Sequence, residues 1–235
     1  MALHTAREFA AREAHILLAG RDRQRLDGIA ADLRVRGARQ VDVLPPFDVQ
    51  DEDSLLWTVN HAWEICPTLA HVLIAVGNLP DPEGTETDPA QFRQAVHVNF
   101  TAVAGLCLAV AARMKGQGSG TLSVISSVAG LRGRQSNYVY GSAKGGLNIF
   151  LQGLRNRLHS RGIRVLTLLP GFVDTPMTHD LPKGPLFISA ARAGRLIHKA
   201  MTRSKKDVVY VPGFWWAILA VIRAIPEPVF KRLKL

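Results

Sequence analysis

The chain of 235 residues is short of cysteine, of metal-binding patterns and of acidic charge, and each shortage excludes a class of protein. Its two cysteines, Cys66 and Cys107, form no Cys-x-x-Cys pair, which indicates reduced thiols in the cytosol and no disulfide framework. The eight histidines show no His-Glu-x-x-His spacing, so the sequence predicts no metal site. No apolar run of the signal-peptide type opens the chain, and we expect a cytoplasmic protein.

The shortage of acidic residues leaves a basic excess, with 29 Lys and Arg against 19 Asp and Glu and a net charge of +10. Such a charge favours an anionic partner: a phosphorylated cofactor, an anionic membrane or a nucleic acid. The arginines are spread along expected helices without interleaved aromatic side chains, so nucleic acid is the partner we least expect. The length and a hydrophobic content of 47% are typical of one globular domain.

Short apolar runs alternate along the chain with longer segments of helical period. Strands are expected at residues 14–20, 41–44, 71–76, 121–126, 165–169 and 208–211. Helices are expected at residues 22–35, 51–65, 89–115, 137–159 and 189–202. Continuous apolar strands separated by helices predict an α/β fold, a Rossmann-like doubly wound parallel sheet flanked by helices. Ligands bind such sheets at the carboxyl ends of the strands.

The start of the chain does not fit the start of a complete dinucleotide-binding fold. That fold begins with a strand and a glycine-rich turn, which opens a helix and holds the pyrophosphate. Here residues 1–12 already have a helical pattern and lead into the strand expected at 14–20. We therefore expect a fold without its first strand and glycine-rich loop, from either a truncated sequence or a shortened paralogue. Truncation is favoured, because losing a central strand exposes the edges of its neighbours.

Tyr140 and Lys144 are the most informative pair in the sequence, because their spacing places both on one face of the expected helix. A free tyrosine has a pKa of about 10, too high for easy proton exchange at neutral pH. An ammonium roughly 4–5 Å away, at an effective dielectric near 20, stabilises the phenolate by about 3–4 kcal/mol. We expect Lys144 to lower the pKa of Tyr140 into the range of a general acid or base. Ser127, at the end of an apolar strand, would hydrogen-bond the same substrate oxygen.

This set resembles the short-chain dehydrogenase/reductase family, whose members place a serine after a central strand and Tyr-x-x-x-Lys on the next helix. The resemblance begins near residue 14 and reaches the C-terminus. It rests on the joint spacing of Asn99, Ser127, Tyr140 and Lys144. It implies interconversion of a ketone and a secondary alcohol with NAD(P)H, with Asn99 holding a water that relays protons to the lysine. It also implies a homo-oligomer.

The cofactor-binding residues are expected at the ends of several strands. Gly20 followed by Arg21 favours NADP(H) over NAD(H), because an arginine there accommodates a 2′-phosphate. By the resemblance, Asp48 and Val49 contact the adenine, and the segment 170–175 holds the carboxamide of the nicotinamide. The full expected set is Gly20, Arg21, Asp48, Val49, Ala75, Gly77, Tyr140, Lys144, Pro170, Gly171, Val173 and Thr175.

The last part of the chain forms an expected extension, residues 213–235, after a Rossmann-like domain of residues 1–212. Residues 214–222 are strongly apolar but far fewer than the roughly 20 residues that cross a bilayer. Beside the basic end of the chain they either lie in a membrane interface or pack over the substrate pocket or a subunit interface. Residues 132–140 and 225–233 are similar to bacterial reductases of decaprenylphosphoryl 2-keto-pentofuranose. That similarity implies a lipid-linked keto-sugar and a place at the inner face of the membrane.

Two functions follow for testing. The first is an NADP-dependent oxidoreductase acting on a small-molecule or lipid-linked carbonyl or alcohol. The alternative is a non-catalytic or inactive truncated paralogue that acts as a binding or membrane-associated protein. The set of Ser127, Tyr140 and Lys144 favours the first, and the missing strand and loop favour the second.

Overall fold

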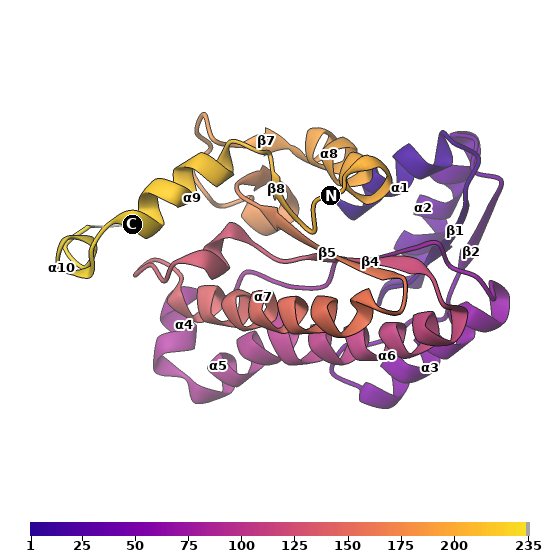
Figure 1. The fold of residues 1–235 in the computed structure, drawn as a ribbon, viewed down its shortest axis with the longest axis horizontal. Helices are drawn as coiled ribbons and strands as arrows, with labels where there is room; N and C mark the ends of the chain where they lie inside the picture. Colours follow the sequence, from indigo (N-terminus) through magenta and orange to yellow (C-terminus); the bar gives the residue numbers. More distant parts are fainter. Residues whose placement is uncertain (234–235) are drawn as a thin grey trace.

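The computed structural model describes residues 1–233 and confirms the predicted α/β fold (Figure 1). A four-stranded parallel sheet has the order β3-β4-β5-β8, and a two-stranded parallel sheet pairs β1 with β2. The bounds are β1 His15–Leu18, β2 Gln40–Val43, β3 His71–Ile74, β4 Gly120–Ile125, β5 Ile163–Pro170 and β8 Val208–Val211. The sequence did not predict two further strands, which pair with each other: β6 (Val173–Asp174) and β7 (Ile188–Ser189).

The parallel strands therefore occur in two separate sheets. Within residues 1–233, no ladder of hydrogen bonds joins β1 to β3. This split agrees with the expectation of a fold that lacks one central strand. Whether the sequence is truncated stays a prediction.

Helices cover both faces of the four-stranded sheet (Figure 1). Helices α3, α6 and α7 lie on one face, and α1 and α8 on the other. The bounds are α1 Ala2–Ala10, α2 Arg23–Val35, α3 Glu52–Ile65, α4 Pro82–Thr87, α5 Pro89–Val96, α6 Ala102–Gln117, α7 Tyr138–His159, α8 Ala190–Arg203, α9 Trp215–Ala224 and α10 Glu227–Phe230. Three of the predicted starts coincide with aspartate or serine caps, Asp22, Asp51 and Ser189, whose side chains accept a backbone N–H of the first turn.

The core explains why the strand sequences are continuously apolar. Successive residues of a strand point to opposite faces of the sheet. In β5, Val165 joins the core beneath α6 and α7, whereas Leu166 and Leu168 join the core beneath α8. All three side chains are fully buried. Because both faces are covered, residues that point to either face of β5 are apolar, and the two polar exceptions, Arg164 and Thr167, have hydrogen-bond partners.

The single helix predicted over residues 89–115 is wrong in one respect. The structure divides it into α5, a π-helical turn at His97–Thr101 and α6. Such turns insert an extra residue into a helix and are frequent at functional sites. The segment is long and apolar enough to cross a membrane, yet Val103, Cys107 and Met114 are buried against the sheet, as in a core helix.

Candidate active site

Ser127 and Tyr140 lie together at the carboxyl end of β4. Ser127 begins the short 3-10 helix η2 (Val128–Leu131), and its hydroxyl oxygen accepts the N–H of Ala129 at 3.1 Å. The same hydroxyl faces the phenol of Tyr140, in the first turn of α7, closely enough to favour its deprotonated form. The structure thus brings together the two hydroxyls that the sequence predicted to share one substrate oxygen.

Glycines let η2 approach α7 closely enough for this contact. A β-carbon on Gly130 would lie 2.5 Å from the carbonyl carbon of Lys144, which is shorter than any normal contact. On the facing helix, a β-carbon on Gly141 would lie 3.0 Å from the Ala129 oxygen, and one on Gly145 would lie 3.2 Å from the Gly130 oxygen. Sequence reasoning missed this role, although glycines four apart on one helix face are a readable signal.

Lys144 is buried beside Tyr140, as the spacing predicted. Only 3% of its surface is exposed, and its Nζ lies 5.8 Å from the centre of the Tyr140 ring. Burial lowers the pKa of Lys144 to about 8, because the charged form loses its hydration. Among residues 1–233, none of the salt bridges involves this lysine. A buried ammonium without a carboxylate partner suits contact with a polar ligand.

The expected direction of the Tyr140 pKa shift is wrong for this structure. Burial raises the pKa of Tyr140 above its ordinary value, and the hydrogen bond with Ser127 only partly offsets that rise. Desolvation of the phenolate is the largest cause of this shift, and Lys144 is not among its causes. Tyr140 therefore keeps its proton at neutral pH.

Asn99 is the fourth predicted catalytic residue that the structure places here. It lies within the π-helical turn and is completely buried. Its amide nitrogen donates to the Ala95 carbonyl at 3.0 Å and to Oδ1 of Asn78 at 2.8 Å, and its Oδ1 accepts the Asn78 N–H at 3.2 Å. Asn78 follows Gly77 in the segment after β3, and the sequence analysis did not predict its role. It fixes the orientation of the Asn99 amide.

Gly77 lies between Asn99 and Lys144. A β-carbon there would lie 2.9 Å from Oδ1 of Asn99 and 3.1 Å from Nζ of Lys144. The glycine also has a φ of 152°, which other residues rarely adopt. The bare backbone therefore leaves a cradle between the amide and the ammonium, and a side chain would fill it.

The expected nucleotide-binding residues lie along a chain of contacts that spans the split between the sheets. The Phe47 N–H donates to the Gly20 carbonyl at 3.2 Å. Phe47 and Val49 are buried together against Val76, the residue before Gly77. Three further residues of the expected nucleotide-binding set lie on the same segments: Arg21 and Ala75, which are exposed, and Asp48, which is half-buried. The segment at 47–49 thus connects the end of β1 to the catalytic side.

The segment expected to hold the nicotinamide carboxamide has another neighbour. A β-carbon on Gly171 would lie 1.9 Å from the indole of Trp215, so the open face of this glycine is filled by α9. Pro170 ends β5 and Val173 is buried in β6. The Thr175 N–H donates to Oγ1 of Thr178 at 3.2 Å. Packing of Trp215 is sufficient reason for Gly171, and the carboxamide role stays a prediction.

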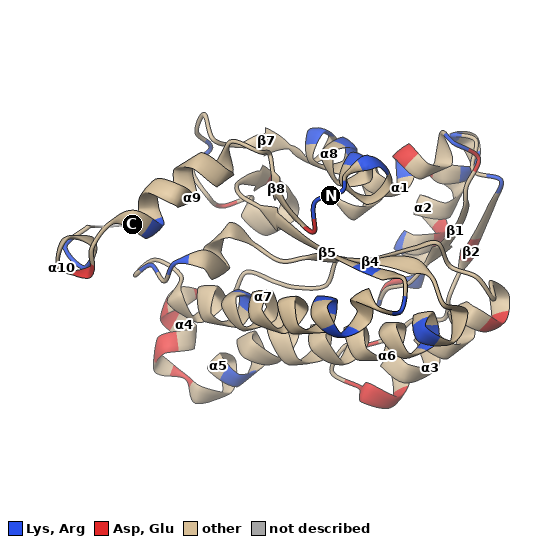
Figure 2. Ribbon diagram, in the orientation of Figure 1, with Lys and Arg blue, Asp and Glu red and all other residues tan. Residues whose placement is uncertain are grey.

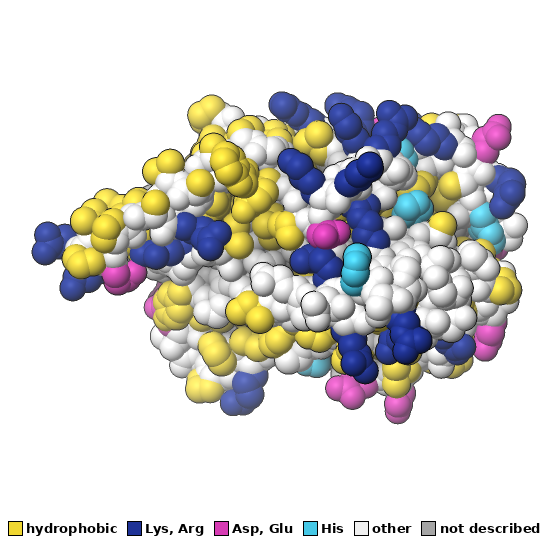
Figure 3. Space-filling model, in the orientation of Figure 1, with side chains coloured by type: hydrophobic (Ala, Val, Ile, Leu, Met, Phe, Trp, Pro, Cys, Tyr) yellow, Lys and Arg dark blue, Asp and Glu magenta, His cyan; other side chains and the backbone are white. Residues whose placement is uncertain are grey.

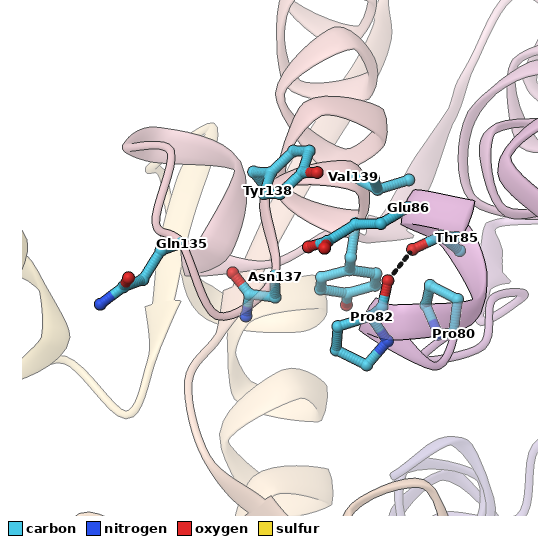
Figure 4. A pocket seen from close by; sticks show the side chains of 9 residues that line it. Pro80, Pro82, Thr85, Glu86, Gln135, Asn137, Tyr138 and Val139 are labelled. Carbon is cyan, nitrogen blue, oxygen red and sulfur yellow. Dashed lines mark hydrogen bonds between the residues drawn. The ribbon is translucent and has the colours of Figure 1, made fainter. Parts of the chain in front are cut away.

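A cavity opens beside Tyr140 between α4 and the start of α7 (Figure 4). In Figure 4 the carboxylate of Glu86 lies between Tyr138 and the prolines at the start of α4. The lining residues are Pro80, Pro82, Thr85, Glu86, Gln135, Asn137, Tyr138, Val139 and Tyr140. A second hollow, lined by Lys115, Arg157, Ser160 and Arg161, lies at the far end of α7, where cations complement the helix dipole.

Comparison with known proteins decides the family. The model of the short chain dehydrogenase family matches residues 1–185. The chain belongs to the short-chain dehydrogenase family. This confirms the resemblance drawn from Ser127, Tyr140 and Lys144, and it makes the protein an oxidoreductase of a family that binds NAD(P) and acts on alcohols and ketones.

Relatives within the family include an uncharacterized oxidoreductase of Mycobacterium tuberculosis, 36% identical over 228 residues, which cover 97% of this chain and 90% of the relative. The cis-4-hydroxycyclohexanecarboxylate dehydrogenase of Sinomonas cyclohexanicum is 34% identical over 197 residues. The matched region covers 82% of this chain and 77% of that relative. Among solved structures, a short-chain dehydrogenase from Sphingobium yanoikuyae in complex with NADPH has a TM-score of 0.79 at 23% identity, covering 95% of this chain and 91% of its own. Levodione reductase has a TM-score of 0.80 at 23% identity, covering 92% and 93%. These two structures bear on the fold alone.

Proposed function

We propose that the protein is an NADPH-dependent reductase that converts a ketone into a secondary alcohol. The observation that carries this proposal is the placement of buried Lys144 beside the Tyr140 ring, with the Ser127 hydroxyl facing the same phenol. The phenol of Tyr140 is protonated at neutral pH, as an ordinary tyrosine is, and burial favours that form further. A protonated phenol is the form that gives a proton to a carbonyl oxygen, which is the reductive direction.

Each residue of the site has one task in this proposal. Tyr140 donates its proton to the carbonyl oxygen, and Ser127 holds the same oxygen in place. Lys144 contacts the ribose next to the nicotinamide and supplies positive charge beside Tyr140. Asn99 supports a relay that returns a proton to Lys144. The cradle at Gly77, between Asn99 and Lys144, fits a bound dinucleotide, which supplies the hydride.

The choice of NADPH over NADH rests on the end of β1. Arg21 is exposed there and follows Gly20, where an acidic residue would otherwise hydrogen-bond the 2′-hydroxyl of NAD. Among residues 1–233, no carboxylate forms a salt bridge with Arg21. Its guanidinium is therefore available to a 2′-phosphate.

For the substrate we propose a cyclic ketone, in the cell a lipid-linked keto-sugar. Two features support it. The loop before Tyr140 carries Arg134, a partly buried cation whose pKa burial lowers and which forms no salt bridge within residues 1–233; this suits a phosphate group. On the outer surface of the C-terminal segment, Phe214, Trp216, Val221 and Val229 are exposed.

A place at the inner face of the membrane follows from the same surface. Figure 3 shows hydrophobic side chains gathered over α9 and α10, and Lys and Arg gathered over α8 and α1 on the same face. Figure 2 shows the basic residues along α8. Exposed Arg192, Arg195, Lys199 and Arg203 recur there at three- and four-residue spacing. Apolar and basic groups side by side match an anionic lipid surface.

Flotation with vesicles tests this location. We expect the protein to float with vesicles that contain anionic phosphatidylglycerol and less with neutral phosphatidylcholine vesicles. Replacing Trp216 and Val221 by Ser should remove the flotation. Protein that stays in the soluble fraction with both kinds of vesicle contradicts the location and leaves the reductase proposal standing.

We also propose a homo-oligomer. Leu108 on α6 and Ile149 on α7 are 54% and 71% exposed, and both lie on helices whose other faces are buried. Exposed apolar side chains on neighbouring helices favour a contact between copies. Light scattering after size-exclusion chromatography tests this, and a mass of one chain contradicts it.

The alternative, a non-catalytic binding or membrane-associated protein, is favoured by one observation. The nucleotide-side strands β1 and β2 form a sheet apart from the catalytic one. Calorimetric titration with NADPH separates the two functions. Absence of binding favours the alternative, whereas binding favours the reductase.

The reductase proposal is tested by NADPH consumption with a panel of cyclic ketones. The panel includes 4-oxocyclohexanecarboxylate, the ketone that corresponds to the alcohol named in the Sinomonas relative. We expect ketone-dependent loss of NADPH and formation of the matching alcohol, identified by mass spectrometry. A protein that binds NADPH but reduces none of the ketones contradicts the proposal.

A further inference from the structure

The C-terminal arm, residues 214–233, touches the body of the protein beside the catalytic turn (Figure 1). At its base, Trp215 and Leu219 on α9 are buried in one cluster with Val128 and Leu169. Val128 directly follows Ser127, so the base of the arm packs against the turn that carries a catalytic hydroxyl. The arm then extends past the start of α7 (Figure 1).

Toward its tip, the arm makes three contacts with one side chain, Arg132. The guanidinium donates to Oε2 of Glu227 at 2.7 Å and to the carbonyl of Ile225 at 3.3 Å. It also lies over the Phe230 ring, 4.1 Å from the ring centre. Only 24% of the Arg132 side chain is exposed. These contacts tie the junction of α9 and α10 to the loop that follows η2.

Local chemistry explains why an arginine stands there. Helix α9 ends at Ala224, and carbonyls at the end of a helix have no partner within it. Arg132 donates to the carbonyl of Ile225, the residue that caps this end. A flat guanidinium with several donors can pair with a carboxylate and a carbonyl while its face stacks on an aromatic ring. The ammonium of a lysine cannot make all three contacts.

The loop that Arg132 anchors leads into the catalytic helix. Arg132 lies between Ser127 and Tyr140 in the chain. Two later residues of this loop, Gln135 and Asn137, line the cavity beside Tyr140 (Figure 4). Gln135 also donates to the Leu233 carbonyl at 3.5 Å, a second contact of the loop with the arm. A displaced arm therefore displaces a wall of the substrate cavity.

We propose that Arg132 is a positioning residue that fastens the C-terminal arm to the loop 131–137 and thereby shapes the substrate side of the active site. It touches neither the reacting atoms nor the cofactor side. Its loss should weaken substrate binding while leaving the Ser127–Tyr140 pair and NADPH binding in place. The kinetic part of this inference rests on the proposed reductase function.

The test compares Arg132→Gln and Arg132→Lys with Arg223→Gln, a matched control on the arm itself. Arg223 is exposed on α9 and takes part in no salt bridge among residues 1–233. For each variant we would measure KM and kcat with 4-oxocyclohexanecarboxylate, the Kd of NADPH, and hydrogen exchange of residues 215–230. Phe230→Leu, alone and combined with Arg132→Gln, removes the opposite side of the contact.

We expect both Arg132 variants to raise KM about tenfold, with kcat and the Kd of NADPH within about twofold of the parent. Exchange in α9 and α10 should accelerate, Arg223→Gln should change nothing, and Phe230→Leu should add little to Arg132→Gln. Unchanged KM and exchange in the Arg132 variants, full function in Arg132→Lys, or equal effects in Arg223→Gln would overturn the inference. If the parent reduces no ketone, the reductase proposal fails, and hydrogen exchange alone still decides whether Arg132 holds the arm.

Discussion

The four-stranded sheet that carries the proposed catalytic residues is more deeply buried than the two-stranded sheet on the proposed nucleotide side. Strands β4 and β5 lie inside a four-stranded sheet, where Leu122, Val124 and Leu166 are fully buried. Every residue of β1 is partly exposed, and within the described residues 1–233 β1 pairs with β2 alone. The proposed catalytic residues are thus positioned by packing within one core, whereas the proposed nucleotide-binding residues depend on contacts such as Phe47 with Gly20. We therefore expect catalytic geometry and cofactor affinity to be separable in this fold.

Hydrogen exchange gives the largest expected contrast between the two sides. Strand amides that open only by global unfolding exchange most slowly, and those of a small separate sheet open locally. We expect β1 and β2 to exchange at least about a hundredfold faster than β4 and β5 in native buffer. Equal protection of the two sheets, measured by mass spectrometry, would show that the sheets form one cooperative unit and would remove the comparison.

The next effect concerns the glycine contact on the catalytic side. Gly130→Ala places a methyl group 2.5 Å from the Lys144 carbonyl carbon, so η2 must move away from α7. We expect the free energy of unfolding to fall by about 1–3 kcal/mol, together with loss of the Ser127–Tyr140 contact and of turnover. Chemical denaturation and the ketone assay measure the two effects.

Gly153→Ala is the control on the same helix. A β-carbon there meets nothing within 4 Å, and the residue is exposed. Alanine is the better helix former, so this variant should gain about 0.5–1 kcal/mol and keep its activity. If Gly130→Ala is as stable as Gly153→Ala, close packing of η2 on α7 does not hold the site together.

A smaller effect is expected on the nucleotide side. Arg21→Glu replaces the cation offered to a 2′-phosphate by a carboxylate. We expect the preference for NADPH over NADH, measured as the ratio of dissociation constants, to fall about tenfold or more. Arg25→Glu makes the same charge change on α2 and should leave the ratio nearly unchanged. A ratio that does not respond to Arg21 would remove this residue from the cofactor site.

The smallest effect is a loss of stability in mild acid. Burial lowers the pKa of His71 and of His198, which both pack against Phe9. The unfolded chain, with a histidine pKa of about 6.5, binds protons that the folded chain does not, so stability is complete above about pH 6.5 and declines as the pH falls toward the lower folded values. Denaturation midpoints at pH 7.5 and 5.5 measure it.

A double variant, His71→Gln with His198→Gln, should flatten this pH dependence. His159→Gln, at an exposed position, should not. A midpoint for the parent that is independent of pH over this interval would mean that the two histidines are not buried as neutral groups.

Much of this molecule is predictable from its sequence, because local periodicity fixes the elements and their order. The strand ends place Ser127 and Gly77 correctly, and helical spacing places Lys144 beside Tyr140. What spacing cannot give is burial, and burial sets the direction of the Tyr140 pKa, opposite to the expected one. The loss of water around the phenol, which spacing does not reveal, is the largest cause of that shift.

Contacts between distant segments were also beyond the sequence. The π-helical turn that buries Asn99, its hydrogen bonds with Asn78, and the Arg132 contacts with α10 all join residues far apart in the chain or alter a regular helix locally. Composition indicated an apolar C-terminal segment with two alternative surroundings. Trp215 is buried against the turn after Ser127, as the packed alternative expects, whereas Trp216 is 64% exposed, and the membrane interface stays a prediction.

The central claim is that the phenol of Tyr140 gives its proton to a ketone in a site assembled without help from the nucleotide side. Turnover and NADPH affinity of Tyr140→Phe test it most directly, with Tyr210→Phe on β8 as the control. We predict a loss of turnover of at least about a hundredfold, with the Kd of NADPH within about twofold of the parent and near-normal turnover in the control. Tyr140→Phe that reduces ketones at nearly the parent rate would contradict the account.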